Sequence, residues 1–327
     1  MRLCRLFAVT IAAVLLLTGS AGAAEWRVPG HFHTIQAAID SSKVVDGDTI
    51  LVRHPVHTGA TVKKAVTIKA QHRVTISGGP VVGPLGQAGF LFAGGGAGSG
   101  ATITGFAFHK VAFPVFSRGA NDVSVTHNSM WWSIQAVTNW ANGKWGNGWH
   151  VSHNEISDLR TSCGGGIGIL VGDYAGATVT GNEIAHNVIR GWVHVPHTDC
   201  GGYNAPGITL FADFRYPGDL GAVIEGNRVF KNRVIVASTK PSLVTASAIE
   251  LSDTRGLPGQ IVIQGNDVVY NDLRGTAVPF EFSPDDLETK NRVEPNYTGP
   301  GGPCPDRALT AATSATTAST TEAAPVR

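Results

Sequence analysis

The sequence predicts an all-β solenoid in which short strands stack coil upon coil. The first observation is a repeat, seen in residues 260–271 as alternating apolar residues, Gly-Asn, a second apolar run and another Asn. It recurs in 222–232 and 178–187 and, with small departures, in 151–158 and 125–130. The second observation is composition, because 41 glycines and 15% charged residues indicate many turns and strands hidden from water. With 43% hydrophobic residues, the 327-residue chain can also fill a sizeable core.

Residues 1–23 have the pattern of a secretory signal peptide. Arg2 and Arg5 form a positive end, residues 6–17 form an apolar run, and residues 21–23 form a small-residue cleavage site. The apolar run is too short for a comfortable membrane span, so we expect a secreted or periplasmic protein. Without the two arginines, the 25 basic residues fall to 23 against 24 acidic ones. This balance gives nucleic acid no electrostatic footprint.

Three cysteines stay in the exported protein after Cys4 leaves with the signal peptide. In an oxidising compartment, Cys163 and Cys200 could form a disulfide, because they bracket one irregular region, with Cys304 left over. The sequence does not fix this pairing, and free or buried thiols are the alternative.

A short amphipathic helix is expected near the N-terminus. Ile35, Ala38 and Ile39 fall on one face at helical spacing, and Thr34 can cap the start of the helix. A turn and an apolar strand follow in residues 46–52. The helical segment followed by this strand resembles the opening of right-handed parallel β-helix proteins, the superfamily that includes pectate lyases and pectin esterases.

The resemblance covers roughly residues 30–285 and implies a right-handed parallel β-helix, with the short N-terminal helix capping its open end. We place this domain at residues 24–300. Such a cap is needed because a terminal coil would otherwise expose unpaired strand groups and a bare core to water. Residues 301–327 form an Ala/Thr-rich tail that cannot bury a core, so we expect it to be disordered.

Asparagine is expected at the turns for a structural reason. Asn tolerates the left-handed backbone of a sharp corner, and stacked Asn side chains can hydrogen-bond from coil to coil. We therefore predict a structural role for Asn128, Asn154, Asn182, Asn187, Asn227, Asn232, Asn266 and Asn271.

The first candidate binding site is an aromatic cluster that holds five of the seven tryptophans: Trp131, Trp132, Trp140, Trp145 and Trp149. Flat, amphipathic indole rings on a surface make a platform for stacking sugar rings, and the loop between them is rich in amides. Carbohydrate recognition is therefore one interpretation. The alternative is that most of these rings pack a long loop against the solenoid.

A second candidate lies in the insertion 191–204, which contains His194, His197, Asp199 and Tyr203. The imidazoles and the carboxylate could bind a metal or exchange protons with a sugar, with Asp199 as the metal ligand and His194, His197 and Tyr203 in contact with the substrate. Solvated loop residues at the surface are the alternative interpretation.

A third candidate consists of charged residues at strand ends, where neighbouring coils stack about 5 Å apart. Asp213 with Arg215, and Asp253 with Arg255, could provide catalytic groups, and Asp173 could join in binding Ca²⁺. Acidic residues that bind Ca²⁺ beside a basic residue that withdraws a proton would be the pectate-lyase arrangement. Ordinary surface Asp–Arg pairing explains the same residues as well.

Two functions follow from the sequence. In the first, the protein binds or processes an extracellular polysaccharide along a lateral groove, with Ca²⁺-assisted cleavage of a uronan as the candidate reaction. This requires the loop 131–149 and the Asp213 strand end to face the same groove. In the second, a non-catalytic secreted or cell-surface scaffold binds a partner through its loops, with buried tryptophans and scattered acidic residues. The motifs expected of pectin esterases and polygalacturonases are absent from the sequence, which disfavours those two activities.

Overall fold

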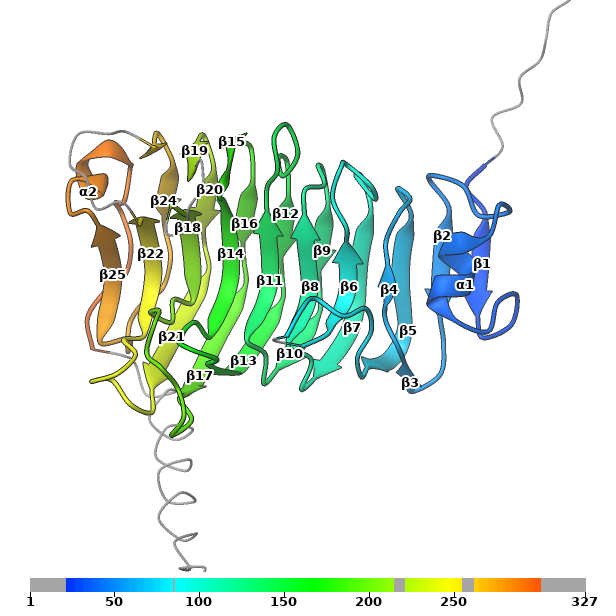
Figure 1. The fold of residues 1–327 in the computed structure, drawn as a ribbon, viewed down its shortest axis with the longest axis horizontal. Helices are drawn as coiled ribbons and strands as arrows, with labels where there is room; N and C mark the ends of the chain where they lie inside the picture. The colour runs from blue at the N-terminus through cyan, green and yellow to red at the C-terminus, as the bar shows by residue number, and fades with distance from the viewer. Residues whose placement is uncertain (1–21, 85, 215–220, 255–261, 301–327) are drawn as a thin grey trace, which may run out of the picture.

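The computed structural model describes residues 22–84, 86–214, 221–254 and 262–300, and these form a parallel β-helix (Figure 1). The predicted signal peptide up to residue 21, the tail 301–327 with Cys304, and both Arg215 and Arg255 lie outside the described residues. In the described part, the strands form sheets of fourteen, eight and three strands. All seven ladders of the eight-stranded sheet are parallel, which confirms the predicted architecture.

The fourteen-stranded sheet supplies two faces of the solenoid, because β5 (Thr67–Ile76) and β7 (Thr102–His109) run through both. The start of β7 pairs with one set of strands and its end with another, with a bend at Gly105, where φ is 82°. The first face contains β1 (Glu25–Val28), β2 (Thr49–Val52), β9 (Ser124–Thr126), β12 (His150–Ser152), β16 (Glu183–Ala185), β20 (Arg228–Phe230) and β24 (Asp267–Val269). The second face contains β3 (Val56–His57), β10 (Ser129–Trp131), β13 (Glu155–Arg160), β17 (Val188–His194) and β21 (Arg233–Ser238).

The eight-stranded sheet forms the third face. Its strands are β4 (Ala60–Thr61), β6 (Ala88–Phe92), β8 (Phe113–Arg118), β11 (Gln135–Trp140), β14 (Ile167–Asp173), β18 (Ile208–Ala212), β22 (Ser247–Asp253) and β25 (Val278–Ser283). The small sheet consists of β15 (Ala175–Val179), β19 (Gly221–Glu225) and β23 (Ile263–Gln264). Helix α2 (Leu287–Lys290) lies at the opposite end from β1 (Figure 1).

The predicted N-terminal helix is present as α1 (Ile35–Asp40) at the end of the solenoid that β1 and β2 form (Figure 1). Thr34 Oγ1 accepts a hydrogen bond from the backbone N–H of Ala37 at 3.0 Å, which fixes the start of the helix. Ile35, Ala38 and Ile39 are buried in the main core, as their spacing predicted. The helix therefore covers apolar residues of the first coils.

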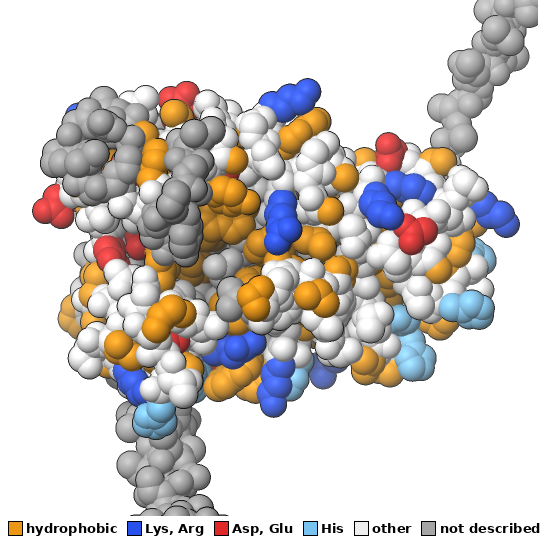
Figure 2. All heavy atoms as spheres, in the orientation of Figure 1, with side chains coloured by type: hydrophobic (Ala, Val, Ile, Leu, Met, Phe, Trp, Pro, Cys, Tyr) orange, Lys and Arg blue, Asp and Glu red, His pale blue; other side chains and the backbone are white. Residues whose placement is uncertain are grey.

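One continuous core runs through the solenoid from Val28 to Leu287, because side chains from all three faces alternate inward. The third face also buries part of its outward side. There, Phe113, Phe116 and Ile134 belong to a second apolar cluster, with Trp140 packed against it. Figure 2 shows a hollow lined with hydrophobic side chains on this face, over the region of β11, β14 and β18.

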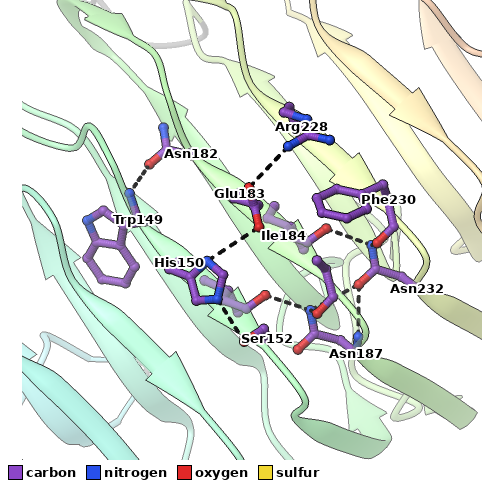
Figure 3. Close-up of polar contacts among 12 residues, drawn as sticks. Trp149, His150, Ser152, Asn182, Glu183, Ile184, Asn187, Arg228, Phe230 and Asn232 are labelled. Atoms are coloured by element: carbon purple, nitrogen blue, oxygen red, sulfur yellow. Dashed lines mark hydrogen bonds and ion pairs between the residues drawn. The ribbon is translucent and has the colours of Figure 1, made fainter.

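Buried and half-buried asparagines stack in two ladders along the corners of the solenoid, and Figure 3 shows the step from Asn187 to Asn232 in one of them. Asn187 is typical: its backbone N–H and its Nδ2 both donate to Asn232 Oδ1 at 3.0 Å, and Nδ2 also donates to the carbonyl of Val151 at 2.9 Å. One ladder contains Asn128, Asn154, Asn187, Asn232, Asn271 and Asn296; the other contains Asn182, Asn227, Asn266 and Asn291. The structural role predicted for eight of these residues is confirmed.

The left-handed backbone, in contrast, belongs to the residue before eight of the ten ladder asparagines and not to the asparagine itself. In the first ladder these residues include His127, His153, His186, Lys231 and Tyr270, with φ between 55° and 58°. The prediction that Asn adopts this conformation was wrong. The asparagine is needed one position later, where its amide reaches both neighbouring coils.

Candidate functional site

The five clustered tryptophans occupy four different environments. Trp149 is buried in the main core with 1% of its surface exposed, and its Nε1 donates to the carbonyl of Ala120 at 2.7 Å. Its ring lies 5.8 Å from that of Phe92. The prediction that Trp149 contacts a substrate was therefore wrong, because the strand alternation directs this ring inward.

Trp145 packs against the glycine-rich segment 94–100. A Cβ atom added at Gly96 would lie 2.4 Å from the Trp145 ring, so the ring rests directly on the backbone there. Lys144 Nζ lies 4.9 Å from the centroid of the same ring. This arrangement agrees with the alternative interpretation, in which tryptophans hold a loop against the solenoid.

Trp131 is the last residue of β10 on the second face, and Trp132 follows it. Both belong to a row of aromatic rings. Trp131 stacks on His109 with 4.4 Å between centroids, Trp132 lies 4.4 Å from His194, and the two indoles are 5.5 Å apart. Trp131 Nε1 donates to Asp158 Oδ2 at 3.2 Å. Burial lowers the pKa of His194, and Asp158 only partly opposes this shift, which favours the neutral imidazole. The structure thus brings three predicted residues together, but each ring is in contact with a neighbouring ring.

Trp140 lies on the outward side of the third face and begins a wall of aromatic side chains. Its ring is 5.6 Å from Tyr174 and 5.9 Å from Phe211, and Phe211 is 5.2 Å from Tyr203. Because Phe211 lies two residues before Asp213, the Trp140 ring and the end of β18 share one side of the sheet, as the carbohydrate hypothesis required for this tryptophan. Trp140 and Tyr203 are the two predicted substrate-binding residues that belong to this wall.

Beside the aromatic wall, two glutamates on neighbouring strands form the polar part of the same face. Glu250 on β22 and Glu281 on β25 are in register. They line a pocket of ≈ 260 Å³, here called the groove. Its lining residues are Gly201, Gly202, Tyr203, Asn204, Glu250, Ser252, Glu281 and Ser283.

The carboxylates of the groove have different hydrogen bonds. Glu250, 3% exposed, accepts a hydrogen bond from Thr209 Oγ1 to its Oε2 at 2.7 Å. Glu281 Oε1 accepts one from Asn204 Nδ2. Glu281 Oε2 is buried and has no hydrogen-bond partner among the described residues. An unsatisfied buried acceptor costs about 1–3 kcal/mol, so a ligand that donates to this oxygen would regain that energy.

The disulfide between Cys163 and Cys200 is formed, and it holds the loop that lines the groove. A Cβ added at Gly202 would lie 3.4 Å from both sulfur atoms, so this loop passes directly over the bridge. Asp199 accepts hydrogen bonds from Thr161 Oγ1, from Gly164 N at 2.7 Å and from Gly201 N at 2.8 Å. The disulfide and Asp199 therefore fix the position of the loop that carries Tyr203 and Asn204.

The predicted metal ligands Asp173 and Asp199 serve as local caps in separate parts of the structure. Asp173 is fully buried, and its Oδ2 accepts from the backbone N–H of Ala177 at 2.7 Å. Burial raises the pKa of Asp173. For Asp199, burial raises the pKa, but hydrogen bonds from Thr161, Gly201 and Gly164 together lower it below its usual value. Among the described residues, no group of three or more His, Cys, Asp or Glu side chains could hold a metal ion.

The strand-end aspartates do not converge on the groove. Asp173 lies two residues after Val171, and Asp253 lies two residues after Leu251. Because Val171 and Leu251 belong to the core and side chains alternate along a strand, both aspartates also point inward, and each is at most 1% exposed. Ala212 on β18 pairs with Asp173 on β14 and with Asp253 on β22, so strand β18 separates the two aspartates. The prediction that they meet in a lateral groove was wrong, because the alternation directs them inward.

Two other predicted residues, Asp213 and His197, do not line the groove. Asp213 follows β18, is 4% exposed, and contacts Thr254 Oγ1 through Oδ1 at 3.5 Å. His197 is exposed, and its Nδ1 lies 3.3 Å from Lys240 Nζ. His197 thus lies outside the groove lining.

Sequence reasoning missed Glu250 and Glu281 as site residues. The available signal was their position: each is a glutamate flanked on both sides by large apolar residues near the middle of a strand, in 247–253 and 278–283. Because side chains alternate along a strand, a carboxylate between two core residues faces outward. Two such carboxylates at equivalent positions of neighbouring coils lie side by side.

Comparison with known proteins gives no family assignment. No protein-family model matches the chain, and no curated protein matches it. Among solved structures, the Dettilon tailspike protein is similar at 14% sequence identity with a TM-score of 0.23. The match covers 75% of this chain and 64% of the tailspike chain, so it spans less than two thirds of that protein. In the described residues, no helix is long and apolar enough to cross a membrane.

Proposed function

We propose that this protein is exported and binds a polysaccharide along the outward side of the third face, with Glu250 and Glu281 acting on a glycosidic bond. The observation that carries the proposal is the pair of in-register carboxylates in a groove beside an aromatic wall. The predicted signal peptide and the resemblance of residues 34–52 to pectate-lyase-like proteins agree with it.

The aromatic wall suits the apolar faces of sugar rings. Trp140, Tyr174, Phe211 and Tyr203 follow one another at centroid distances of 5.2–5.9 Å. Tyr174 is 39% exposed, so this end of the wall is open to a ligand. Stacking on such rings would hold a chain of sugars across several strands, and hydroxyl groups could then donate to the carboxylates at the far end.

The carboxylate pair suits hydrolysis of a glycosidic bond. Such a reaction needs one carboxylic acid that protonates the leaving oxygen and one carboxylate that acts as base or nucleophile. Glu250 and Glu281 are in register on neighbouring strands, which lie about 4.8 Å apart, so both carboxyl groups can reach the same glycosidic bond. Thr209 holds Glu250 from one side and Asn204 holds Glu281 from the other, so both side chains are positioned before a substrate binds.

Ca²⁺-assisted elimination from a uronan is the second candidate reaction. The position of Asp213 favours elimination. Asp213 lies two residues after Phe211, whose ring faces outward, so the alternation along the chain directs Asp213 to the same side. Arg215 or Arg255 would be the base in this reaction. Asp173 and Asp253 could not join Asp213 around one surface ion without a change in their inward orientation.

The test is to incubate the exported protein with a panel of neutral and uronic-acid polysaccharides, with Ca²⁺ and with a chelator. New reducing ends without ultraviolet absorbance would establish hydrolysis. Calcium-dependent absorbance from unsaturated products would establish elimination instead. Binding without either product would leave a carbohydrate-binding scaffold, the non-catalytic alternative. Absence of both binding and products across the panel would contradict the proposal.

A further inference from the structure

A second pocket lies far along the chain from the groove, at the corner between the first and second faces. Its volume is ≈ 600 Å³. Six residues from two neighbouring coils line it: Arg53, His54, Pro55, Gln71, His72 and Arg73. Four of the six carry cationic or titratable basic groups, and none carries a carboxylate.

The local sequence explains why these side chains converge. Residues 53–55 connect β2 on the first face to β3 on the second, and His54 is left-handed with φ of 89°. In the next coil, β5 continues through the same corner, but its register with β7 shifts between Lys69 and Val74. His72 is left-handed there, with φ of 65°. A shift of this kind re-aims side chains, and here it places residues 71–73 beside 53–55.

The two arginines have no ion-pair partner among the described residues. By contrast, Arg190 pairs with Glu155, and Arg292 pairs with Asp267 at 2.8 Å. In addition, Arg53 Nε is buried without a hydrogen-bond partner in the described part of the chain. A buried guanidinium donor without an acceptor costs free energy that an anionic oxygen would recover.

The same corner continues as a line of basic side chains along the solenoid. The imidazoles of His127, His153 and His186 stack with 5.0 Å between successive centroids, and Lys231 takes the equivalent left-handed position in the next coil. All four side chains are exposed. A polymer that bound at the pocket would meet these groups if it ran along the corner.

We propose that the pocket of Arg53 and Arg73 binds an oxyanion, a carboxylate or sulfate group carried by an acidic polysaccharide that lies along this corner. Guanidinium groups are planar donors that match such anions, and two of them from neighbouring coils can hold one group between them. This site is separate from the groove and does not depend on Glu250 or Glu281.

The test measures the affinity of the exported protein for dextran sulfate, polygalacturonate and neutral dextran at low salt. Arg53→Gln and Arg73→Gln should each weaken binding of at least one acidic polymer by about tenfold or more, since each removes a charged hydrogen-bond donor. Arg73→Lys should keep part of the affinity. Arg190→Gln, which removes an exposed arginine already paired with Glu155, should change it little.

Competition identifies the source of the anion. Displacement of the polymer by millimolar inorganic sulfate would show that a single oxyanion fills the pocket, whereas resistance to sulfate would show that the polymer contributes further contacts along the corner; both outcomes support the site. Equal binding of neutral dextran would overturn the proposal. So would unchanged affinity in Arg73→Gln, an exposed position where folding can be verified by the melting temperature, or a preference for DNA over both acidic polysaccharides.

Discussion

Glu250 and Glu281 occupy facing positions on the neighbouring parallel strands β22 and β25, and Glu281 Oε2 is buried without a hydrogen-bond partner among the described residues. An unsatisfied buried acceptor is costly for stability, and here it lies on the strand next to a second carboxylate. Such an arrangement is typical of a site that a ligand completes.

Removal of one carboxylate should separate binding from turnover. Glu281→Gln keeps the shape of the side chain and an acceptor for Asn204, but it cannot exchange a proton. We expect product formation to fall by at least about a hundredfold while polysaccharide affinity changes little. Initial rates and binding isotherms measured on the same preparation would check this.

The matched control is Glu155→Gln, because Glu155 is an exposed glutamate on the second face that pairs with Arg190. Its turnover should equal that of the unchanged protein. If Glu281→Gln were fully active, the assignment of chemistry to the groove would be wrong.

Trp140 should contribute to polysaccharide binding, whereas Trp131 should not. Trp140→Ala removes the ring that joins Tyr174 and Phe211, so we expect affinity to fall by about tenfold. Trp131→Ala deletes a ring of similar size on the second face and should leave affinity unchanged. Isothermal titration with the best polysaccharide of the panel would compare them, and a loss of affinity in Trp131→Ala but not in Trp140→Ala would point to the second face instead.

The asparagine ladder should make a large contribution to stability. Asn187→Ala removes the bonds to Asn232 and to the Val151 carbonyl and leaves buried backbone groups without partners. We expect the free energy of unfolding to fall by about 3 kcal/mol. Asn142→Ala, at an exposed asparagine whose backbone N–H and carbonyl are hydrogen-bonded to the backbone of Trp145, should cost under about 0.5 kcal/mol in the same urea titration. Similar costs for both would mean that the ladder is not cooperative.

Asp173 should give a pH-dependent effect of definite sign. Burial raises its pKa, so its charged form costs folding energy: stability from this group is complete below its unfolded pKa and is lost as pH rises through the folded pKa. Asp173→Asn should therefore be neutral or stabilising at pH 7, with any gain vanishing near pH 3, because an amide oxygen can still accept from Ala177. Urea unfolding at both pH values would measure it.

The same variant tests the metal hypothesis. If Asp173 bound Ca²⁺, the unchanged protein would gain stability on addition of Ca²⁺ and Asp173→Asn would lose that gain. We expect the two proteins to respond equally to Ca²⁺, since the carboxylate faces the core and caps its own turn.

Local patterns in the sequence were sufficient for the fold. The repeat that ends in Asn266 and Asn271 specifies strand, corner and ladder together, because alternation and corner chemistry act over only a few residues. The helix capped by Thr34 could be predicted for the same reason. The left-handed backbone was predicted for the ladder asparagine, one residue too late. The left-handed residue and the ladder asparagine are adjacent, and the sequence does not show which of the two has which role.

Which residues form the candidate site depends on the face of the solenoid on which each side chain lies, and only the tertiary structure shows this. Five tryptophans that are neighbours in the sequence are distributed to the core, a loop and two faces, because they belong to one coil, which turns through all three faces in the 26 residues from Asn128 to Asn154. For the same reason, Glu250 and Glu281 are separated along the chain but meet in register, while Asp173 and Asp253 point inward. The sequence alone determined the repeating coil and its internal hydrogen bonds, which are local; only the stacking of coils decided which side chains share a surface, because those contacts join residues a full coil apart.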